Sequence, residues 1–424
     1  MIKTIIVFII VFGILVIFHE FGHYIVARRS GIMVREFSIG MGPKLFYHRS
    51  GSTTFTVRLL PLGGYVLMAG NEDDGSDELK PGTPVSLKLN EKGVVTSINT
   101  SKKQGLFQGV PLTVSASNLD DELWLKGYEN GDDSKEVKYP VDHDATIIES
   151  DGTEMQIAPR DVQFKSASLP KRMLTNFAGV FNNFILAIIV YTLLSFVQGG
   201  VFSNSNKVDI APNVSIARDA GIKSGDRIVS INGKKTDNWD QLALEIQSNP
   251  DKKVPVKFTS GNKTTTKEVK IGSQTANNKK IGLLGITRSL ETSFSAKIVS
   301  GFTQTWSVGK QLLSTLWSMV SGHFSLNDLG GPVAIFATTS QAASYGLAGI
   351  LNFLAFLSLN LAIINLIPIP GLDGGKLILN IIEAIRRKPV SERTETVVTL
   401  IGFAFLMLLM LLVTWNDIQR YFIH

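Results

Sequence analysis

His19, Glu20 and His23 form the pattern H-E-x-x-H within the apolar run that opens the chain. A helix turns about 100° per residue, so side chains four positions apart point to nearly the same side. Two neutral imidazoles placed in this way can hold one Zn²⁺ and supply two of the three protein ligands of a typical catalytic zinc. The adjoining carboxylate of Glu20 can accept a proton from water that such a metal polarises. The spacing therefore predicts metal-assisted hydrolysis at a depth that water reaches.

A carboxylate far along the chain is the predicted third ligand. The segment NLIPIPGLDGG contains Pro368, Pro370 and Asp373. Its two prolines must break a membrane helix, which frees backbone groups and directs a carboxylate inward. Asp373 could instead cap the helix that follows it. A basic loop comes shortly after Asp373, as basic residues come shortly after His23, so we expect both to lie at one depth and favour Asp373 as a ligand.

The composition suits a protein with membrane and soluble parts. Of its 424 residues, 44% are hydrophobic, and the mean hydropathy is +0.17. The net charge of +6 is modest, and basic residues gather at the ends of apolar runs, so we expect no nucleic-acid partner. The chain has no cysteine, which excludes a thiolate metal site and a cysteine nucleophile. Any domain on an oxidising side must be stable without disulfides.

Four apolar runs are long enough, at about 1.5 Å per residue, to cross a hydrocarbon core of about 30 Å. A cleaved signal peptide is the alternative for the first run. It fits less well, because the helical pattern continues to Arg28 and Arg29 and no A-x-A-like cleavage site follows the apolar core. We expect spans at residues 1–28, 171–198, 347–385 and 397–424, with a cytoplasmic loop at 386–396 between the last two.

Basic residues near the ends of these spans set the expected orientation. By the positive-inside rule, the segments that carry them are cytoplasmic. Both termini would then be extracytoplasmic in a multi-pass protein of the cell membrane, and the HEFGH site would open toward the cytoplasmic side. The basic residues are Arg28, Arg29, Arg35, Lys171, Arg172, Arg386, Arg387, Lys388 and Arg393.

Two β-rich regions are expected between the first two spans. Residues 29–71 contain three short strands, VREFSIG, TFTVRLL and GYVLMAG, with Gly63 and Gly64 joining the last two. These strands are apolar enough to enter the membrane from the cytoplasmic side as a re-entrant region, where a sheet edge must be covered by protein or water. Residues 72–170 are more polar, with short alternating segments, and predict a small cytosolic β domain.

The outward part predicts an α+β domain at residues 199–290. AGIKSGDRIVSINGK places a glycine-containing turn before a strand that ends at Asn232-Gly233, and a helix is expected from about Trp239. This segment resembles a PDZ domain of the bacterial protease-associated kind, which implies peptide binding at a sheet edge. A spacer or size-excluding module is the alternative. Residues 291–346 are amphipathic and predict an interfacial segment.

The expected fold class is an α-helical integral membrane protein with four transmembrane helices, a membrane-associated β region, a small cytosolic β domain and one α+β PDZ domain. Its motifs resemble the site-2 protease family of intramembrane zinc metalloproteases. HEFGH matches the family pattern H-E-x-x-H, and NLIPIPGLDGG matches N-x-x-P-x-P-x-L-D-G. The resemblance covers essentially the whole chain in an RseP-like arrangement, and the polar insert is most similar to the Gram-positive, Eep-type members. It implies Zn²⁺ held by His19, His23 and Asp373, with Glu20 as general base and later acid.

The resemblance also implies a transmembrane helix as substrate and the lipid bilayer as surroundings. Such a helix must unwind locally, because its carbonyls are bonded within it, and the sheet near residues 55 to 69 offers an edge for the freed strand. Family analogy suggests anti-sigma factors and signal-peptide remnants, cut first by an upstream site-1 type protease. The implied substrate-binding residues are Asn360, Asn365, Pro368, Pro370, Gly63, Gly64 and Tyr65, and the implied supporting residues are Gly179 and Asn183. Asn360 could instead join neighbouring helices.

Two other function classes fit parts of the pattern. Buried His, Asp and Asn also mark translocation paths, as in a metal or ion transporter. Four spans without an inverted repeat disfavour that reading. A noncatalytic PDZ membrane scaffold is the other alternative, and it would not need Glu20.

Overall fold

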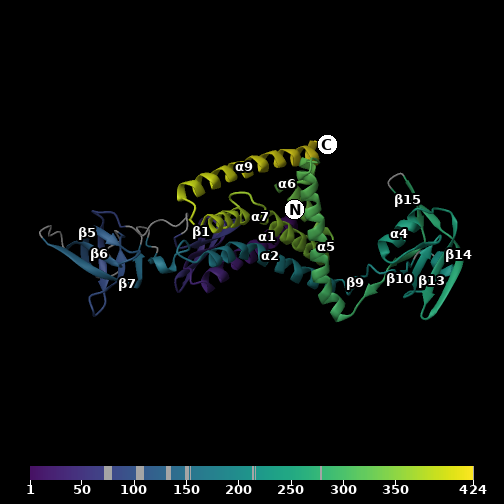
Figure 1. The fold of residues 1–424 in the computed structure, drawn as a ribbon, viewed down its shortest axis with the longest axis horizontal. Coiled ribbons are helices and arrows are strands. Elements are labelled where there is room, and N and C mark those ends of the chain that lie inside the picture. Colours follow the sequence, from purple (N-terminus) through teal and green to yellow (C-terminus); the bar gives the residue numbers. More distant parts are fainter. Residues whose placement is uncertain are drawn as a thin grey trace. The chain divides into compact units, whose positions relative to one another are not determined.

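The computed structural model describes residues 1–70, 79–101, 109–129, 135–148, 152, 154–212, 214, 216–276 and 279–423. The chain forms two compact units, one of which is Ile189–Gln304 and the other the remainder. Figure 1 shows the elements in sequence colours.

Among the described residues, four helices are long and apolar enough to cross a membrane, in agreement with the predicted number of spans. They are α1 (Ile2–Arg29), α2 (Leu169–Val197), α7 (Gly346–Leu366) and α9 (Glu392–Ile418). The segment 347–385, treated as one span from the sequence, consists of two helices, because α7 ends at Leu366 and α8 (Asp373–Arg386) begins seven residues later. Pro368 and Pro370 lie in the break, where a proline has no N–H to continue a helix.

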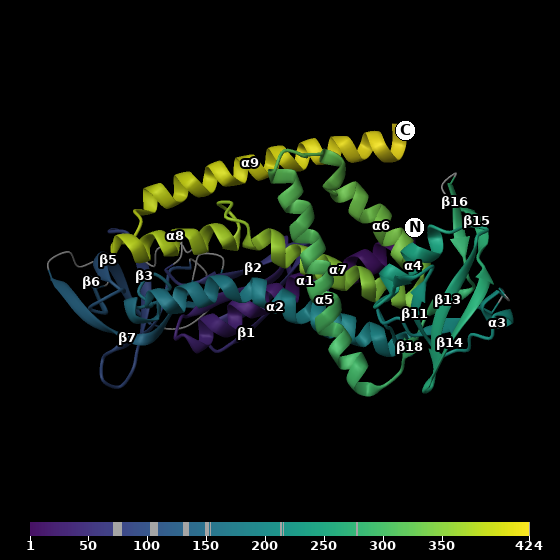
Figure 2. The same cartoon turned by 45° about the vertical axis from the view of Figure 1, so that its right-hand side comes forward.

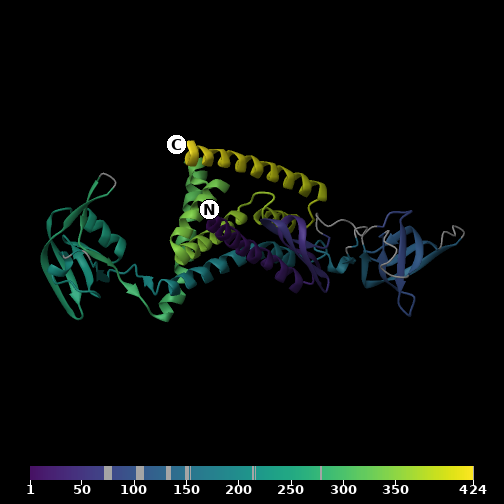
Figure 3. The same ribbon diagram turned by 180° about the vertical axis from the view of Figure 1, so that it is seen from behind.

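The region after α1 forms two long bent strands, β1 (Val34–Ser50) and β2 (Thr53–Met68). The expected turn at Gly63 and Gly64 does not divide the second strand. Instead, Phe37 pairs with both Phe55 and Val66, so residues 34–39 lie between 54–57 and 64–68. Positive φ angles at Gly40 (+87°) and Gly63 (+77°) allow these bends at little cost. Seen from behind, α1, in purple, runs from the N mark toward these strands (Figure 3).

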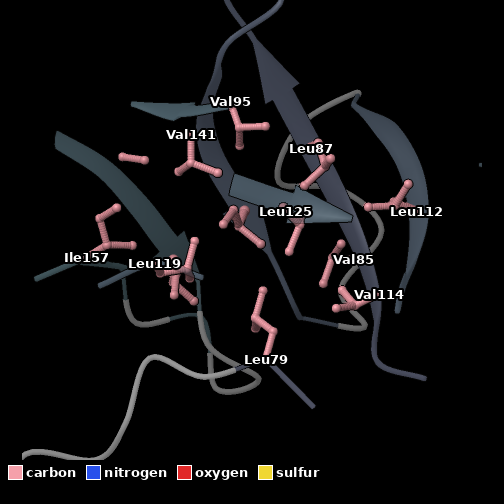
Figure 4. Packing of buried hydrophobic residues seen from close by; sticks show 13 residues of the cluster. Leu79, Val85, Leu87, Val95, Leu112, Val114, Leu119, Leu125, Val141 and Ile157 are labelled. Carbon is pink, nitrogen blue, oxygen red and sulfur yellow. The ribbon is translucent and has the colours of Figure 1, made fainter. Parts of the chain in front are cut away.

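The polar insert folds as a six-stranded sheet with the order β4-β3-β5-β6-β7-β8, and a further pairing of β4 with β7 closes it on itself. Its strands are β3 (Pro84–Leu89), β4 (Val95–Asn99), β5 (Val110–Asn118), β6 (Trp124–Glu129), β7 (Glu136–Ile148) and β8 (Glu154–Gln156). Alternate residues of these strands, among them Leu87, Leu125 and Val141, fill the core (Figure 4). The 3-10 turn η1 (Arg160–Val162) leads to α2.

The unit Ile189–Gln304 contains a four-stranded antiparallel sheet, in the order β12-β11-β13-β14, and three short strand pairs (Figure 2). Helix α4 begins after Asn238, whose side chain accepts a hydrogen bond from the backbone N–H of Gln241. The core joins the sheet to α4 through Ile228, Leu242 and Val256. The elements are β9 (Val201–Phe202), β10 (Val208–Ile210), α3 (Ile216–Asp219), β11 (Arg227–Ile231), β12 (Lys234–Lys235), α4 (Trp239–Gln247), β13 (Lys253–Ser260), β14 (Lys263–Lys270), β15 (Gly272–Ala276), β16 (Lys279–Leu283), β17 (Ile286–Arg288) and β18 (Leu290–Glu291).

The predicted interfacial segment, 291–346, contains two helices. Helix α5 (Phe294–Val320) begins in the second unit and continues into the first, and α6 (Pro332–Ser344) follows the short turn η2 (Leu326–Asp328). Trp306 and Trp317 on α5 are 77% and 73% exposed, as expected for aromatic groups that contact lipid. The chain ends in a π turn, η3 (Gln419–Ile423).

Candidate metal centre

The structure brings the three predicted ligands together at the start of α8. The Nε2 atoms of His19 and His23 on α1 lie 3.4 Å apart, and each is 3.3 Å from Oδ2 of Asp373. Four ligands arranged tetrahedrally at about 2.0–2.1 Å from a zinc ion are about 3.3–3.4 Å from one another. The three donor atoms therefore have the separations that a tetrahedral zinc ion requires. Within the described part of the chain, this is the one group of three His, Cys, Asp or Glu residues close enough to hold a metal.

The surroundings of Asp373 also fit a metal ligand. Its Oδ2 is buried and accepts no hydrogen bond from any described residue. An unpaired buried carboxylate oxygen is costly unless it is coordinated or paired with a cation. The alternative role of helix cap is not seen, because Leu372 occupies the N-cap position of α8 and Asp373 is its first residue. Two imidazole nitrogens and one carboxylate oxygen form a ligand set that zinc commonly takes.

Two glycines allow α8 to start close enough to α1. A Cβ added to Gly374 would overlap the carbonyl oxygen of Ile367, and one added to Gly375 would overlap that of Ile369. The chain therefore turns back tightly on the proline-containing segment before α8 begins. Pro370 lies against α9, because a Cβ added to Gly402 of α9 would overlap the carbonyl oxygen of Pro370. The LDGG part of the motif thus has two roles. It contains Asp373, and its two glycines determine where Asp373 lies.

Helix α2 orients both imidazoles. Nδ1 of His23 lies 2.7 Å from the backbone oxygen of Thr175, which can only accept, so Nδ1 carries the proton and Nε2 keeps its lone pair for a metal. The Asn183 amide lies 3.0 Å from Nδ1 of His19. Its Oδ1 is buried without a hydrogen-bond partner among the described residues. A half-turn of this amide would place Oδ1 on the Nδ1–H of His19 and give this ring the same tautomer.

Close approach of α2 to α1 depends on small side chains. A Cβ on Gly179 would overlap Nε2 of His23 and would lie 2.9 Å from Nε2 of His19. On α1, a Cβ on Gly22 would overlap the carbonyl oxygen of Ala178. The Asn182 amide donates to the carbonyl oxygen of Phe18 at 2.8 Å and holds the two helices together. The predicted supporting residues, Gly179 and Asn183, therefore both lie directly at the histidines.

A cavity of about 730 Å³ opens at the three ligands, and Glu20 lines it. Gly64 and Tyr65 of β2 lie in the same wall. A Cβ on Gly64 would lie 3.2 Å from Cγ of Glu20 and 2.6 Å from the backbone oxygen of Ser38. A side chain here would overlap the backbone of β1, so glycine allows β2 to lie against β1 next to Glu20. The strand and the carboxylate line the same cavity.

The other predicted substrate-binding residues are not among those that line this cavity. Asn360 and Asn365 are half-buried on α7, and neither they nor Gly63, Pro368 and Pro370 lie in the cavity wall. Gly371, next to Pro370, does line it.

Several groups at the site were not singled out from the sequence. Arg58 donates to Glu36 at 2.8 Å and to the Tyr65 hydroxyl at 2.6 Å, so an ion pair within the β1–β2 region holds Tyr65 in place. Charged residues in an otherwise apolar strand were an available signal for this pair. The backbone oxygen of Thr175 gave no signal, because any residue type provides one.

Comparison with known proteins agrees with this geometry. The model of peptidase family M50 matches residues 7–409. The chain is 50% identical over 423 residues to the probable protease eep of Enterococcus faecalis, covering 99% of this chain and 100% of that protein. It is 48% identical over 427 residues to a putative zinc metalloprotease of Streptococcus pyogenes, covering 99% of each. It is 43% identical over 438 residues to one of Lactococcus lactis, covering 100% of each. The chain belongs to peptidase family M50, the site-2 protease family, and is a zinc metalloprotease.

Proposed function

We propose that this intramembrane protease cuts single-span proteins within or beside their membrane helix, with zinc held by His19, His23 and Asp373 and with Glu20 as general base and later acid. The observation that carries the proposal is one cavity with three kinds of lining group. These are the three donor atoms that could hold zinc, the carboxylate of Glu20 and strand β2. Family membership favours this hydrolase over a transporter or a noncatalytic scaffold.

A zinc ion bound by these ligands supplies a Lewis acid for the peptide carbonyl and lowers the pKa of a bound water to about 7. Glu20 follows His19 in the chain and faces the same cavity, so its carboxylate can take a proton from the attacking water. The protonated Glu20 can then give this proton to the leaving amine. Because water itself attacks the peptide carbonyl in this scheme, no side chain has to form a covalent intermediate.

The β2 segment 64–68 supports recognition of an unwound substrate. It pairs with residues 34–39 on one edge, and no described residue pairs with its other edge. Gly64, Tyr65, Val66 and Met68 line the cavity. An extended substrate segment could pair with this edge, which replaces the hydrogen bonds lost on unwinding the helix and presents a peptide group beside Glu20.

The membrane orientation and the substrates belong to the same proposal. Basic residues after α1, before α2 and between α8 and α9 favour a cytoplasmic location for the cavity and an extracytoplasmic one for both termini. Residues 199–290 would then lie outside the cytoplasm, as a PDZ domain that selects or excludes substrates. Anti-sigma factors and signal-peptide remnants, shortened first by a site-1 type protease, are the expected substrate classes.

The test is cleavage of a tagged single-span protein by the full-length enzyme in liposomes. Replacement of Glu20 by Gln keeps the size of the side chain and removes the base, so cleavage should fall by about 10² to 10⁴ while bound zinc is retained. The matched control is Glu291→Gln, at an exposed position on β18, which should cleave like wild type. Undiminished cleavage by the Glu20→Gln enzyme would eliminate the proposed role of this carboxylate.

A further inference from the structure

The cavity wall formed by α8 carries a buried amide without a described partner. Asn380 lines the cavity and is 7% exposed, and its Nδ2 makes no hydrogen bond to any described residue. A buried amide normally has its donors and acceptors paired, and leaving them unpaired lowers the stability of the fold. Because Asn380 borders an open space, a group that enters this space can supply the missing partner.

Asn380 lies on the same side of α8 as Asp373. Seven residues separate them, which is nearly two turns and brings the two side chains within about 20° around the helix and about 10 Å along it. Beyond Asn380, Glu383 accepts hydrogen bonds from both terminal nitrogens of Arg172 on α2, at 3.0 and 2.5 Å. Asn380 therefore lies between the metal centre and this ion pair.

The cavity wall formed by β2 leads away from the metal centre in the same direction as α8. Strand β2 begins its cavity-lining segment at Gly64, beside Glu20, and ends it at Met68, which packs against Ala27 near the end of α1. Lys171, next to Arg172, donates to the carbonyl oxygen of Ser30 at 2.8 Å, so the ion pair lies toward this same end of α1. The free edge of β2 and the Asn380 face of α8 thus extend from the metal centre in one direction.

We propose that Asn380 binds the main chain of the extended substrate about three residues from the scissile peptide bond, on the side of the Arg172–Glu383 pair. This inference rests on the proposed function. A strand advances about 3.3 Å per residue, so about 10 Å from the metal corresponds to about three residues. A side-chain amide has N–H donors and a C=O acceptor, and it can pair with the C=O and N–H of one residue of an extended strand, which point to the same side whatever the substrate's side chains are. The substrate segment is then held by β2 on one side and by Asn380 on the other.

The test uses the full-length protein in liposomes and synthetic single-span peptides whose cleavage site has been mapped by mass spectrometry. In each peptide of a series, one backbone amide within about five residues of the scissile bond is replaced by an ester, which removes an N–H donor and weakens a C=O acceptor. Wild type is compared with Asn380→Leu. The control is Ile381→Leu, since Ile381 is 41% exposed and lies outside the cavity wall.

We expect Asn380→Leu to lower kcat/KM about five- to tenfold, as loss of one hydrogen bond does, with zinc content unchanged. The ester about three residues from the scissile bond should lower kcat/KM by a similar factor in wild type and the control and by a smaller factor in Asn380→Leu, because the part of the effect that acts through residue 380 is absent there. Equal ester effects in wild type and Asn380→Leu at every position would overturn the inference. If Asn380→Leu does not fold, the same comparison is made with Asn380→Ala, which removes both the donor and the acceptor.

Failure of the proposed function gives a different result. In that case Glu20→Gln would cleave the unmodified peptide as fast as wild type, or neither would cleave it, and this inference would fall with it. Cleavage that depends on Glu20, combined with an ester profile that does not depend on residue 380, would overturn the inference alone.

Discussion

Gly179 controls how closely α2 approaches the two histidines. Its backbone lies against both imidazoles, and a methyl group at this position would occupy the place of Nε2 of His23. Gly13 on α1 is a natural comparison, because a Cβ there would meet no atom within 4 Å. Both are helical glycines, so the change to alanine has the same effect on helix propensity, and only the contact with the histidines differs.

Replacement of Gly179 by Ala should displace an imidazole and lower zinc affinity by about 10- to 100-fold, the range typical of a disturbed ligand shell. Gly13→Ala should leave zinc affinity unchanged and raise helix stability by up to about 1 kcal/mol. Competition with a chelator of known zinc affinity measures both variants. Equal affinities for Gly179→Ala and wild type would contradict the contact seen here.

Sequence reasoning found the ligands more readily than the groups that orient them. The H-E-x-x-H spacing is local and has a direct geometric meaning on a helix, whereas Asp373 was assigned through its proline-rich context and the family resemblance. Thr175 acts through a backbone oxygen, which leaves no trace in the residue type. Asn360 and Asn365 are polar groups in an apolar helix, a pattern that does not distinguish a cavity wall from contacts between helices.

At the level of elements, α2 and α8 form the sides of the cavity, and the Arg172–Glu383 pair joins them. Both side chains are largely buried, at 14% and 16% exposed. The two hydrogen bonds between them connect the start of α2 to the end of α8, whose first residue is Asp373. Because irregular chain precedes α8, this pair helps to hold Asp373 in place.

Removal of one partner leaves the other charge largely buried and unpaired. Arg172→Met or Glu383→Met should therefore lower the stability by about 2–4 kcal/mol, near the range for broken buried pairs. The double variant should recover much of this loss, because it leaves no uncompensated charge. Thermal unfolding in detergent, followed together with zinc release, measures the cycle. Additive losses in the double variant would show that the two residues act independently.

The β1–β2 region shows where strand patterns were sufficient and where they were not. The three apolar runs were recognised as strands, but Gly63 and Gly64 were read as a turn between two of them. In the structure, Gly63 bends a continuous strand and Gly64 permits contact with Glu20. Both uses of glycine give the same sequence signal, since a turn, a bend and a close approach all require the absence of a side chain.

At the scale of the whole molecule, the described part of the chain contains four candidate spans, and the full sequence has no cysteine. Single cysteines introduced at exposed positions therefore report membrane orientation without background. Lys388 lies in the basic segment between α8 and α9, and Asn262 lies in the turn between β13 and β14.

In intact cells, Lys388→Cys should resist a membrane-impermeant thiol reagent, and Asn262→Cys should react with it. We expect this because basic residues are concentrated around Lys388, and the positive-inside rule places such a segment on the cytoplasmic side. Permeabilised cells provide the control, in which both positions should react. The reverse pattern in intact cells would invert the proposed orientation and place the cavity on the outer side of the membrane.

The proposed metal centre depends most directly on Asp373, since α8 contributes to it through this residue. The decisive measurement is the zinc content per chain of purified wild type, Asp373→Ala and the exposed control Asp328→Ala, each shown to be folded. We predict one zinc per chain for wild type and the control, and a loss of stoichiometric zinc in Asp373→Ala. Stoichiometric zinc held with undiminished affinity by Asp373→Ala would contradict the proposed metal centre.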